Sequence, residues 1–126
     1  MGRTWYPRVD DIINYNKEVL KIYKATKAEK HEIGGETRSR IRRALQSARA
    51  KRGDLEDKSI VLLRRINELH PFGSANRRTA HFAMNKMLYH NKWYLVAMKR
   101  ERQAGIQKLI RQGKLSHKQI RESYKL

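Results

Sequence analysis

The chain of 126 residues contains no cysteine, which excludes a disulfide framework and any metal site built on thiolates. No apolar run approaches the roughly 20 residues that a helix needs to cross a bilayer. The first residues, "MGRTWYPRVDD", lack the apolar core of a secretory signal. These absences predict an intracellular, cytoplasmic protein that has no membrane partner.

Proline and glycine are also scarce, with two and seven residues, while hydrophobic residues make up 39% and charged residues 33% of the chain. Few chain-breaking residues and many charges are typical of helices with solvated outer faces. The length suits one domain with one hydrophobic core. We therefore predict a single compact all-α domain that spans residues 1–126.

Acidic residues are few, with 12 Asp and Glu against 30 Lys and Arg and a formal net charge of +18. Such an excess suggests a polyanionic partner, which could be nucleic acid, a nucleotide or an acidic protein. Because the basic residues are spread along the chain, a solvated basic surface, as in proteins from hot environments, explains most of the charge equally well. The charge alone does not choose between these alternatives.

Helical periodicity predicts about six helices. The first four are expected at 8–26, 36–52, 54–69 and 76–91, and two more are expected after the stretch "KWYLVAM", which could form a short β flap. In the third helix the inward face is predicted to hold Leu55, Ser59, Leu62, Leu63, Ile66 and Leu69.

Acidic residues and histidines show no clear metal-ligand pattern. Asp54, Glu56 and Asp57 lie in the expected first turn of the third helix, where carboxylates cap the helix and oppose its dipole. In the last helix, Ser116 and Gln119 have the spacing of a capping box. The histidines outside the central motif are expected to be surface or core residues: His31, His81, His90 and His117.

The stretch "HPFGSANRRTA" joins the third and fourth helices and begins at His70. Pro71 disfavours helical geometry at His70, so a loop is expected there. The start of the following helix has unpaired N–H groups and a partial positive charge, which together favour an anion. A phosphate can approach the backbone closely because the preceding residues are small: Gly73, Ser74 and Ala75.

Several side chains of this stretch can act on a bound phosphate. Arg77 and Arg78 supply guanidinium groups suited to phosphate oxygens. Asn76 can either orient the loop or donate to an oxyanion, and His70 can act as a base near neutral pH. Phe72 is expected to point into the core and anchor the loop.

The motif "HPFGSANRR" resembles the signature of Fic/Doc proteins, H-x-F-x-[D/E/N]-[A/G]-N-x-R. Its "ANRR" form is closer to Doc toxins than to Fic AMPylators, which prefer Gly-Asn-Gly. The resemblance implies helices around a central helix pair, with the motif loop at the active site, and the use of ATP. A Doc-like toxin would transfer the terminal phosphate to a hydroxyl of a target protein, with elongation factor Tu as the known type of target.

Carried over by position, the resemblance makes His70 the base that activates the acceptor hydroxyl and Phe72 the anchor of the loop. The residues that it assigns to phosphate or nucleotide binding are Gly73, Ser74, Ala75, Asn76, Arg77 and Arg78. Ser74 departs from the pattern, because it occupies the position of an acidic residue that helps to hold Mg²⁺. Serine carries no charge and is a poor ligand for a hard cation, whereas phosphoryl transfer depends heavily on metal.

Two alternatives to the kinase therefore stay open: a Fic-type AMP transferase, and a catalytically degenerate basic binding protein, which could bind nucleic acid. No stretch matches the inhibitory helix [S/T]-x-x-x-E-[G/N] that many Fic proteins carry. Doc-like toxins receive this control from a separate antitoxin. The resemblance thus implies an acidic antitoxin partner, which would also suit the basic surface.

Overall fold

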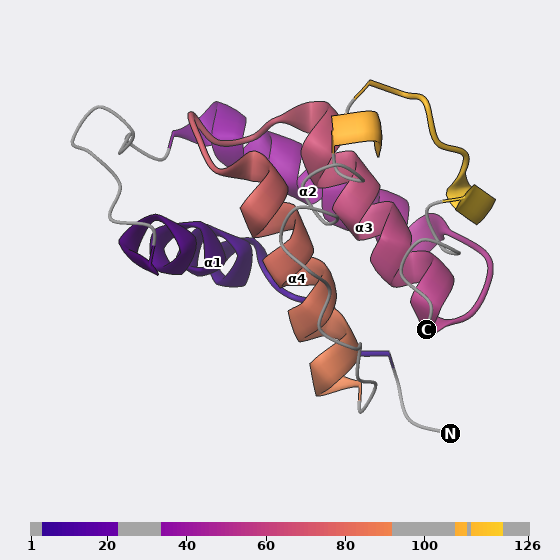
Figure 1. Ribbon diagram of the computed structural model, residues 1–126. Coiled ribbons are helices and arrows are strands. Elements are labelled where there is room, and N and C mark those ends of the chain that lie inside the picture. The colour runs from indigo at the N-terminus through magenta and orange to yellow at the C-terminus, as the bar shows by residue number, and fades with distance from the viewer. Residues whose placement is uncertain (1–3, 23–33, 92–107, 111, 120–126) are drawn as a thin grey trace.

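The computed structural model describes residues 4–22, 34–91, 108–110 and 112–119. They contain the helices α1 (Val9–Ile22), α2 (Gly35–Ala50), α3 (Leu55–Leu69) and α4 (Asn76–His90) (Figure 1). Short helical segments at 108–110 and 117–119 fall within the two helices expected after α4, and the described residues include no strand. The all-α prediction is confirmed. The predicted flap at 92–98 lies outside the described residues.

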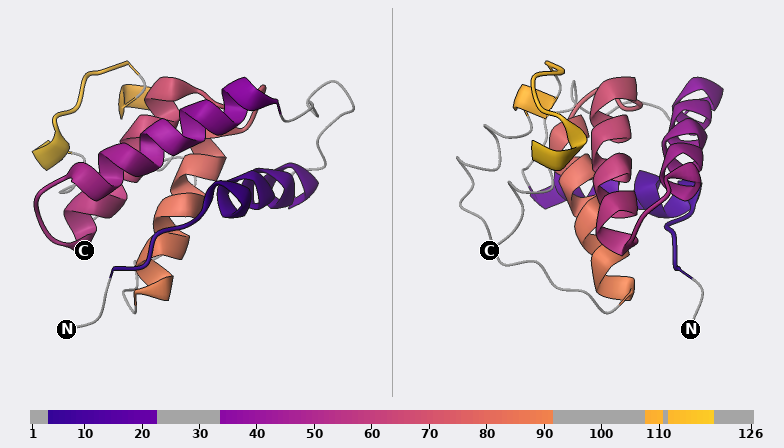
Figure 2. Two further views of the ribbon diagram at one scale, coloured as in Figure 1. Left: turned by 180° about the vertical axis from the view of Figure 1, so that it is seen from behind. Right: turned by 90° about the vertical axis from the view of Figure 1, so that its right-hand side faces the viewer.

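Helix α3 is the central element of the described bundle. It packs against both α2 and α4, and α1 packs mainly against α4 (Figures 1 and 2). The predicted inward face of α3 is buried or partly buried, but Ile60, Val61 and Asn67 are buried as well. The sequence predicted a single buried stripe, whereas neighbours on two sides cover more of this helix.

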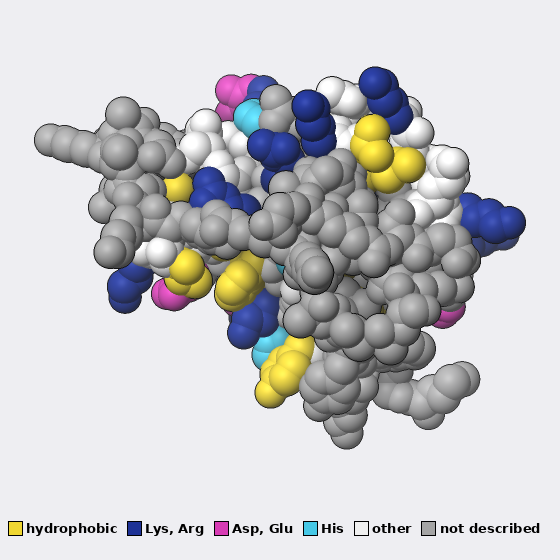
Figure 3. All heavy atoms as spheres, in the orientation of Figure 1, with side chains coloured by type: hydrophobic (Ala, Val, Ile, Leu, Met, Phe, Trp, Pro, Cys, Tyr) yellow, Lys and Arg dark blue, Asp and Glu magenta, His cyan; other side chains and the backbone are white. Residues whose placement is uncertain are grey.

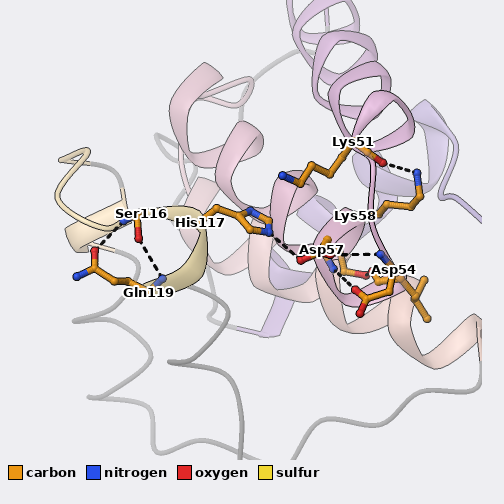
Figure 4. Close-up of polar contacts among 9 residues, drawn as sticks. Lys51, Asp54, Asp57, Lys58, Ser116, His117 and Gln119 are labelled. Carbon is orange, nitrogen blue, oxygen red and sulfur yellow. Dashed lines mark hydrogen bonds and ion pairs between the residues drawn. The ribbon is translucent and has the colours of Figure 1, made fainter.

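The boundaries of the helices follow their caps. Asp54 and Asp57 form the capping box of α3: the Asp57 N–H donates to Asp54 Oδ1 over 2.9 Å, and the Asp54 N–H donates to Asp57 Oδ2 over 3.2 Å. The predicted box at Ser116 and Gln119 is also present. In addition, His117 Nε2 lies 3.0 Å from Asp57 Oδ1, which joins the segment after α4 to the start of α3 (Figure 4).

Helix α2 ends two residues earlier than predicted, at Ala50 instead of Arg52. Lys58 Nζ donates to the Arg49 carbonyl over 3.2 Å and to the Lys51 carbonyl over 2.7 Å. The ammonium group thus occupies carbonyls near the end of the helix that have no N–H partner within it. None of the helices in the described ranges is long and apolar enough to cross a membrane.

We expect Gly53→Ala to destabilise the protein by about 1–3 kcal/mol, because Gly53 has a φ of +144° and lies against Asp57. A Cβ at this position would approach Asp57 Oδ2 to 2.3 Å. Urea unfolding followed by circular dichroism measures the change. The matched control is Gly34→Ala, since Gly34 has a φ of −103° and open space around its Cβ position. Equal losses in both variants would contradict the steric explanation.

Candidate active site

The motif loop, which we define as residues 70–75, leaves α3 and enters α4 through two left-handed residues. His70 has φ 50° and ψ 58°, and Ala75 has φ 61° and ψ 26°. They are the only non-glycine residues with positive φ in the described parts of the chain. Each costs on the order of 1–3 kcal/mol and persists only where the surroundings enforce it.

The conformation of His70 differs from the extended one that a following proline favours. Its N–H donates to the Ile66 carbonyl over 3.0 Å, so α3 continues up to His70 before the chain reverses. A left-handed residue is the usual way to end a helix in this manner. The loop was predicted correctly, but its local geometry was not.

Helix α2 fixes the first part of the motif loop. Thr37 Oγ1 donates to the Pro71 carbonyl over 2.9 Å, and Arg40 Nη1 donates to the His70 carbonyl over 3.2 Å. Thr37 is buried, so water competes little for its bond. These two contacts hold two successive backbone carbonyls at the start of the loop.

Helix α1 fixes the end of the loop through Asn16. Its Nδ2 atom donates to the Ser74 carbonyl over 3.2 Å and to Thr79 Oγ1 over 3.1 Å. Asn16 is 1% exposed on a face of α1 that is otherwise apolar. One buried amide therefore links α1, the motif loop and the first turns of α4.

Asn76 closes the loop upon itself. The Phe72 N–H donates to Asn76 Oδ1 over 2.9 Å, and Asn76 Nδ2 donates to the Phe72 carbonyl over 2.8 Å. Phe72 is 2% exposed in the hydrophobic core, as expected of an anchor. Of the two roles that the sequence left open for Asn76, the structure shows that of orienting the loop.

The groups of the motif that remain accessible are those that could bind an anion or act as a base. His70, Gly73 and Arg77 are exposed, and Ser74, Ala75 and Arg78 are partly exposed. Helix α4 has no side-chain cap at its N-terminus and no acidic residue in its first turn. An uncapped helix start with two arginines in its first turn favours an anion, and an exposed imidazole lies at the other end of the same loop.

The side chains around Ser74 do not supply the ligands that a protein-bound metal ion needs. Glu68, the nearest acidic residue in the sequence, pairs with Arg64 over 3.1 Å and with Arg65 over 3.7 Å. Among the residues that the structure describes, no three His, Cys, Asp or Glu side chains gather where they could hold a metal. Mg²⁺ prefers carboxylate oxygens, and the serine hydroxyl supplies none.

His81 lies in the second turn of α4 and does not compete with His70 as a base. Its burial lowers the pKa from 6.5 to about 4, so the ring is neutral at physiological pH. Two residues with direct roles in loop geometry, Asn16 and Thr37, were not predicted as site residues, and neither was Arg40. The signal that could have found the first two is a polar residue at an inward-facing helical position.

We expect His81 to make the protein less stable in mild acid. The unfolded chain binds a proton at this ring below about pH 6.5, whereas in the folded protein the ring stays unprotonated down to about pH 4. The contribution of His81 is therefore fully present above pH 6.5 and is lost as the pH falls toward 4. Urea unfolding at about pH 7 and about pH 5 should show a smaller loss of stability for His81→Gln than for the wild type. A larger loss in the variant would contradict this assignment.

A comparison with known families agrees with the motif. Residues 6–88, more than half of the chain, match the model of the Fic/DOC family. The matched range contains α1, α2 and α3, the motif loop and most of α4. No curated protein matches the chain. The chain therefore belongs to the Fic/DOC family, whose members transfer nucleotide-derived groups to proteins and typically use ATP and a divalent metal.

Proposed function

We propose that the protein is a Doc-like toxin that transfers the terminal phosphate of ATP to a hydroxyl group of a target protein. The observation that carries this proposal is the motif loop. It presents the exposed His70 at one end and the uncapped, arginine-flanked start of α4 at the other. Contacts from α1, α2 and α4 hold the loop in this form.

The chemistry follows from these groups. The His70 imidazole takes the proton of the acceptor hydroxyl as the hydroxyl oxygen forms a bond to the terminal phosphorus. The bond from that phosphorus to the bridging oxygen breaks, and ADP leaves. The N–H groups at the start of α4, together with Arg77 and Arg78, bind the phosphates and offset their negative charge.

Phosphate transfer is preferred to AMP transfer because of Arg77. This exposed arginine directly follows Asn76, at a position where AMP-transferring Fic proteins prefer glycine. A guanidinium group at the helix start adds charge and directional donors for the phosphates. AMP transfer by the same loop is the alternative, and the two reactions differ in which phosphate of ATP becomes attached to the target.

Ser74 supports a second candidate, a member of the family that binds but does not transfer. It removes the carboxylate that would hold a metal, so charge neutralisation depends on the two arginines and the helix start. A growth assay with wild type and a His70 variant separates the two candidates, because only a transferase loses toxicity together with its base.

We expect Ser74→Asp to raise affinity for magnesium–ATP by roughly tenfold, which corresponds to about 1.4 kcal/mol. The added carboxylate would restore a hard oxygen ligand beside the phosphates. Isothermal titration of wild type and variant with ATP and Mg²⁺ measures the change. Ser74→Asn is the matched control, since asparagine has the size of aspartate but carries no charge. If aspartate binds no better than asparagine, Ser74 does not occupy the metal position.

The proposed target is a translation factor of the elongation factor Tu type, in the cytoplasm, and the proposed regulator is a separate acidic antitoxin. The net charge of +18 supports an acidic partner through long-range attraction. The neighbouring reading frame tests this part of the proposal, which requires it to encode a short acidic protein. A neighbour without acidic character would oppose regulation of this kind.

A further inference from the structure

Outside the candidate active site, the excess of positive charge in the described residues is largest in α2 and the short segment that follows it. Between Gly34 and Gly53 there are seven basic residues and one acidic residue: Arg38, Arg40, Arg42, Arg43, Arg49, Lys51 and Arg52 against Glu36. Helices α1 and α3 carry nearly equal numbers of both signs, and α4 carries Arg77, Arg78 and Lys86 with no acidic residue. The face in Figure 3 likewise mixes basic side chains with acidic and hydrophobic ones. Because Arg77 and Arg78 belong to the candidate active site, α2 is the main basic helix whose charge that site does not use.

Part of this charge already has partners. Arg38 Nη1 lies 2.9 Å from Asp10 Oδ1 on α1, and Arg40 pairs with Glu36 and holds the motif loop. The remaining arginines are exposed and form no ion pair within the described ranges, although the Arg49 guanidinium lies over the Tyr6 ring, 5.1 Å from its centroid; they are Arg42, Arg43, Arg49 and Arg52. We call these four residues, three on α2 and Arg52 just after its end, the α2 arginine face.

The composition of this face favours nucleic acid over an acidic protein. Protein–protein interfaces depend on apolar and aromatic anchors at their centre. The large hydrophobic residues exposed in the described ranges are Ile22, Tyr89 and Leu109, and none of them lies on α2. Interfaces with nucleic acid are more polar and more positively charged, and phosphate contacts account for about half or more of their hydrogen bonds.

The residue type points the same way. The members of this face carry planar guanidinium groups, which match phosphate oxygens better than the ammonium group of lysine does. Arg42 and Arg49 are seven residues apart, so they lie on the same side of the helix, about 10.5 Å from each other along its axis. Figure 2 (left) shows α2 at the front of the molecule, where no other described helix crosses over it.

We infer that the α2 arginine face is a surface that binds the phosphate backbone of nucleic acid without regard to sequence. This function is separate from nucleotide transfer and does not depend on it. Sequence-independent binding is expected because α2 contains no aromatic residue that could stack on bases. The face begins two residues after Arg40, which holds the motif loop.

The salt dependence of binding tests this inference. Each phosphate contact releases counterions, so the logarithm of the affinity for duplex DNA falls with the logarithm of salt by about 0.9 per contact. Fluorescence anisotropy with a labelled duplex of about 20 base pairs, at roughly 50–200 mM salt, gives the slope. We expect the double variant Arg42→Gln, Arg43→Gln to reduce the magnitude of this slope by about 2.

Two controls make the result specific. Lys17→Gln, Lys21→Gln removes the same charge from exposed positions on α1 and is expected to leave the slope within about 0.5 of the wild type. Arg78→Ala is expected to weaken binding of ATP but not of DNA. Circular dichroism confirms that the exposed substitutions leave the fold intact.

Three outcomes would overturn the inference. The first is an equal reduction of the slope in the α1 and α2 variants, which would mean that the charge acts without a defined surface. The second is an unchanged slope in the α2 variant. The third is displacement of the DNA by polyglutamate as effectively as by unlabelled DNA of equal charge, which would assign the face to acidic proteins.

Discussion

His70→Asn is expected to reduce phosphate transfer by about 10²–10⁴-fold, the usual contribution of a general base. The exposed imidazole is the only candidate base on the motif loop, and asparagine cannot accept the proton of the acceptor hydroxyl. Asparagine also tolerates the left-handed conformation that His70 adopts, with its φ of 50°. The substitution therefore removes the base without changing the preference of the backbone. Transfer rates measured beside thermal unfolding test both statements.

His70→Ala is the companion variant. It should lose the same activity, together with a small amount of stability, because alanine accepts the left-handed conformation less readily. Equal losses of activity in the two variants, with a loss of stability in His70→Ala alone, would show that activity depends on the imidazole and stability on the backbone conformation. Transfer and toxicity equal to wild type in the asparagine variant would remove His70 from the mechanism.

Asn76→Leu is expected to destabilise the protein by about 2–6 kcal/mol, since it leaves the N–H and the carbonyl of Phe72 without their bonds. The two bonds have ordinary lengths of 2.9 Å and 2.8 Å, and both are buried. Asn76→Asp is the matched control, because its carboxylate still accepts from the Phe72 N–H but cannot donate to the Phe72 carbonyl. The free energy of unfolding in urea should therefore fall in the order wild type, aspartate, leucine. A loss below about 0.5 kcal/mol for leucine would contradict the role of Asn76 as the clamp of the loop.

The four long helices could be predicted from the sequence because each has an apolar stripe at helical spacing. The acidic cap at the start of α3, the capping box at Ser116 and Gln119 and the start of α4 at Asn76 were also predicted correctly. The end of α2 was missed because it depends on Lys58, a residue of the next helix. The burial of α3 was underestimated for a similar reason, since neighbours on two sides decide which of its residues are covered.

The candidate site divides in the same way. Its motif could be found in the sequence because the residues are contiguous, from His70 to Arg78. The contacts that α1 and α2 make with the loop come from residues 30 to 58 positions away, Arg40 and Asn16 among them, and no local pattern predicts them. The left-handed conformation of His70 was not predicted. Pro71 favours an extended conformation at His70, but the capping of the C-terminal end of α3 by a left-handed residue outweighs this preference.

The most direct test of the proposed function follows labelled phosphate from ATP to an acceptor protein. Wild-type protein and His70→Asn are incubated with an elongation factor of the Tu type and with ATP labelled on either the γ- or the α-phosphate. The proposed mechanism predicts that wild type transfers the γ label and not the α label, and that His70→Asn transfers neither. Transfer of the α label by the wild type would contradict it and identify the protein as an AMP transferase.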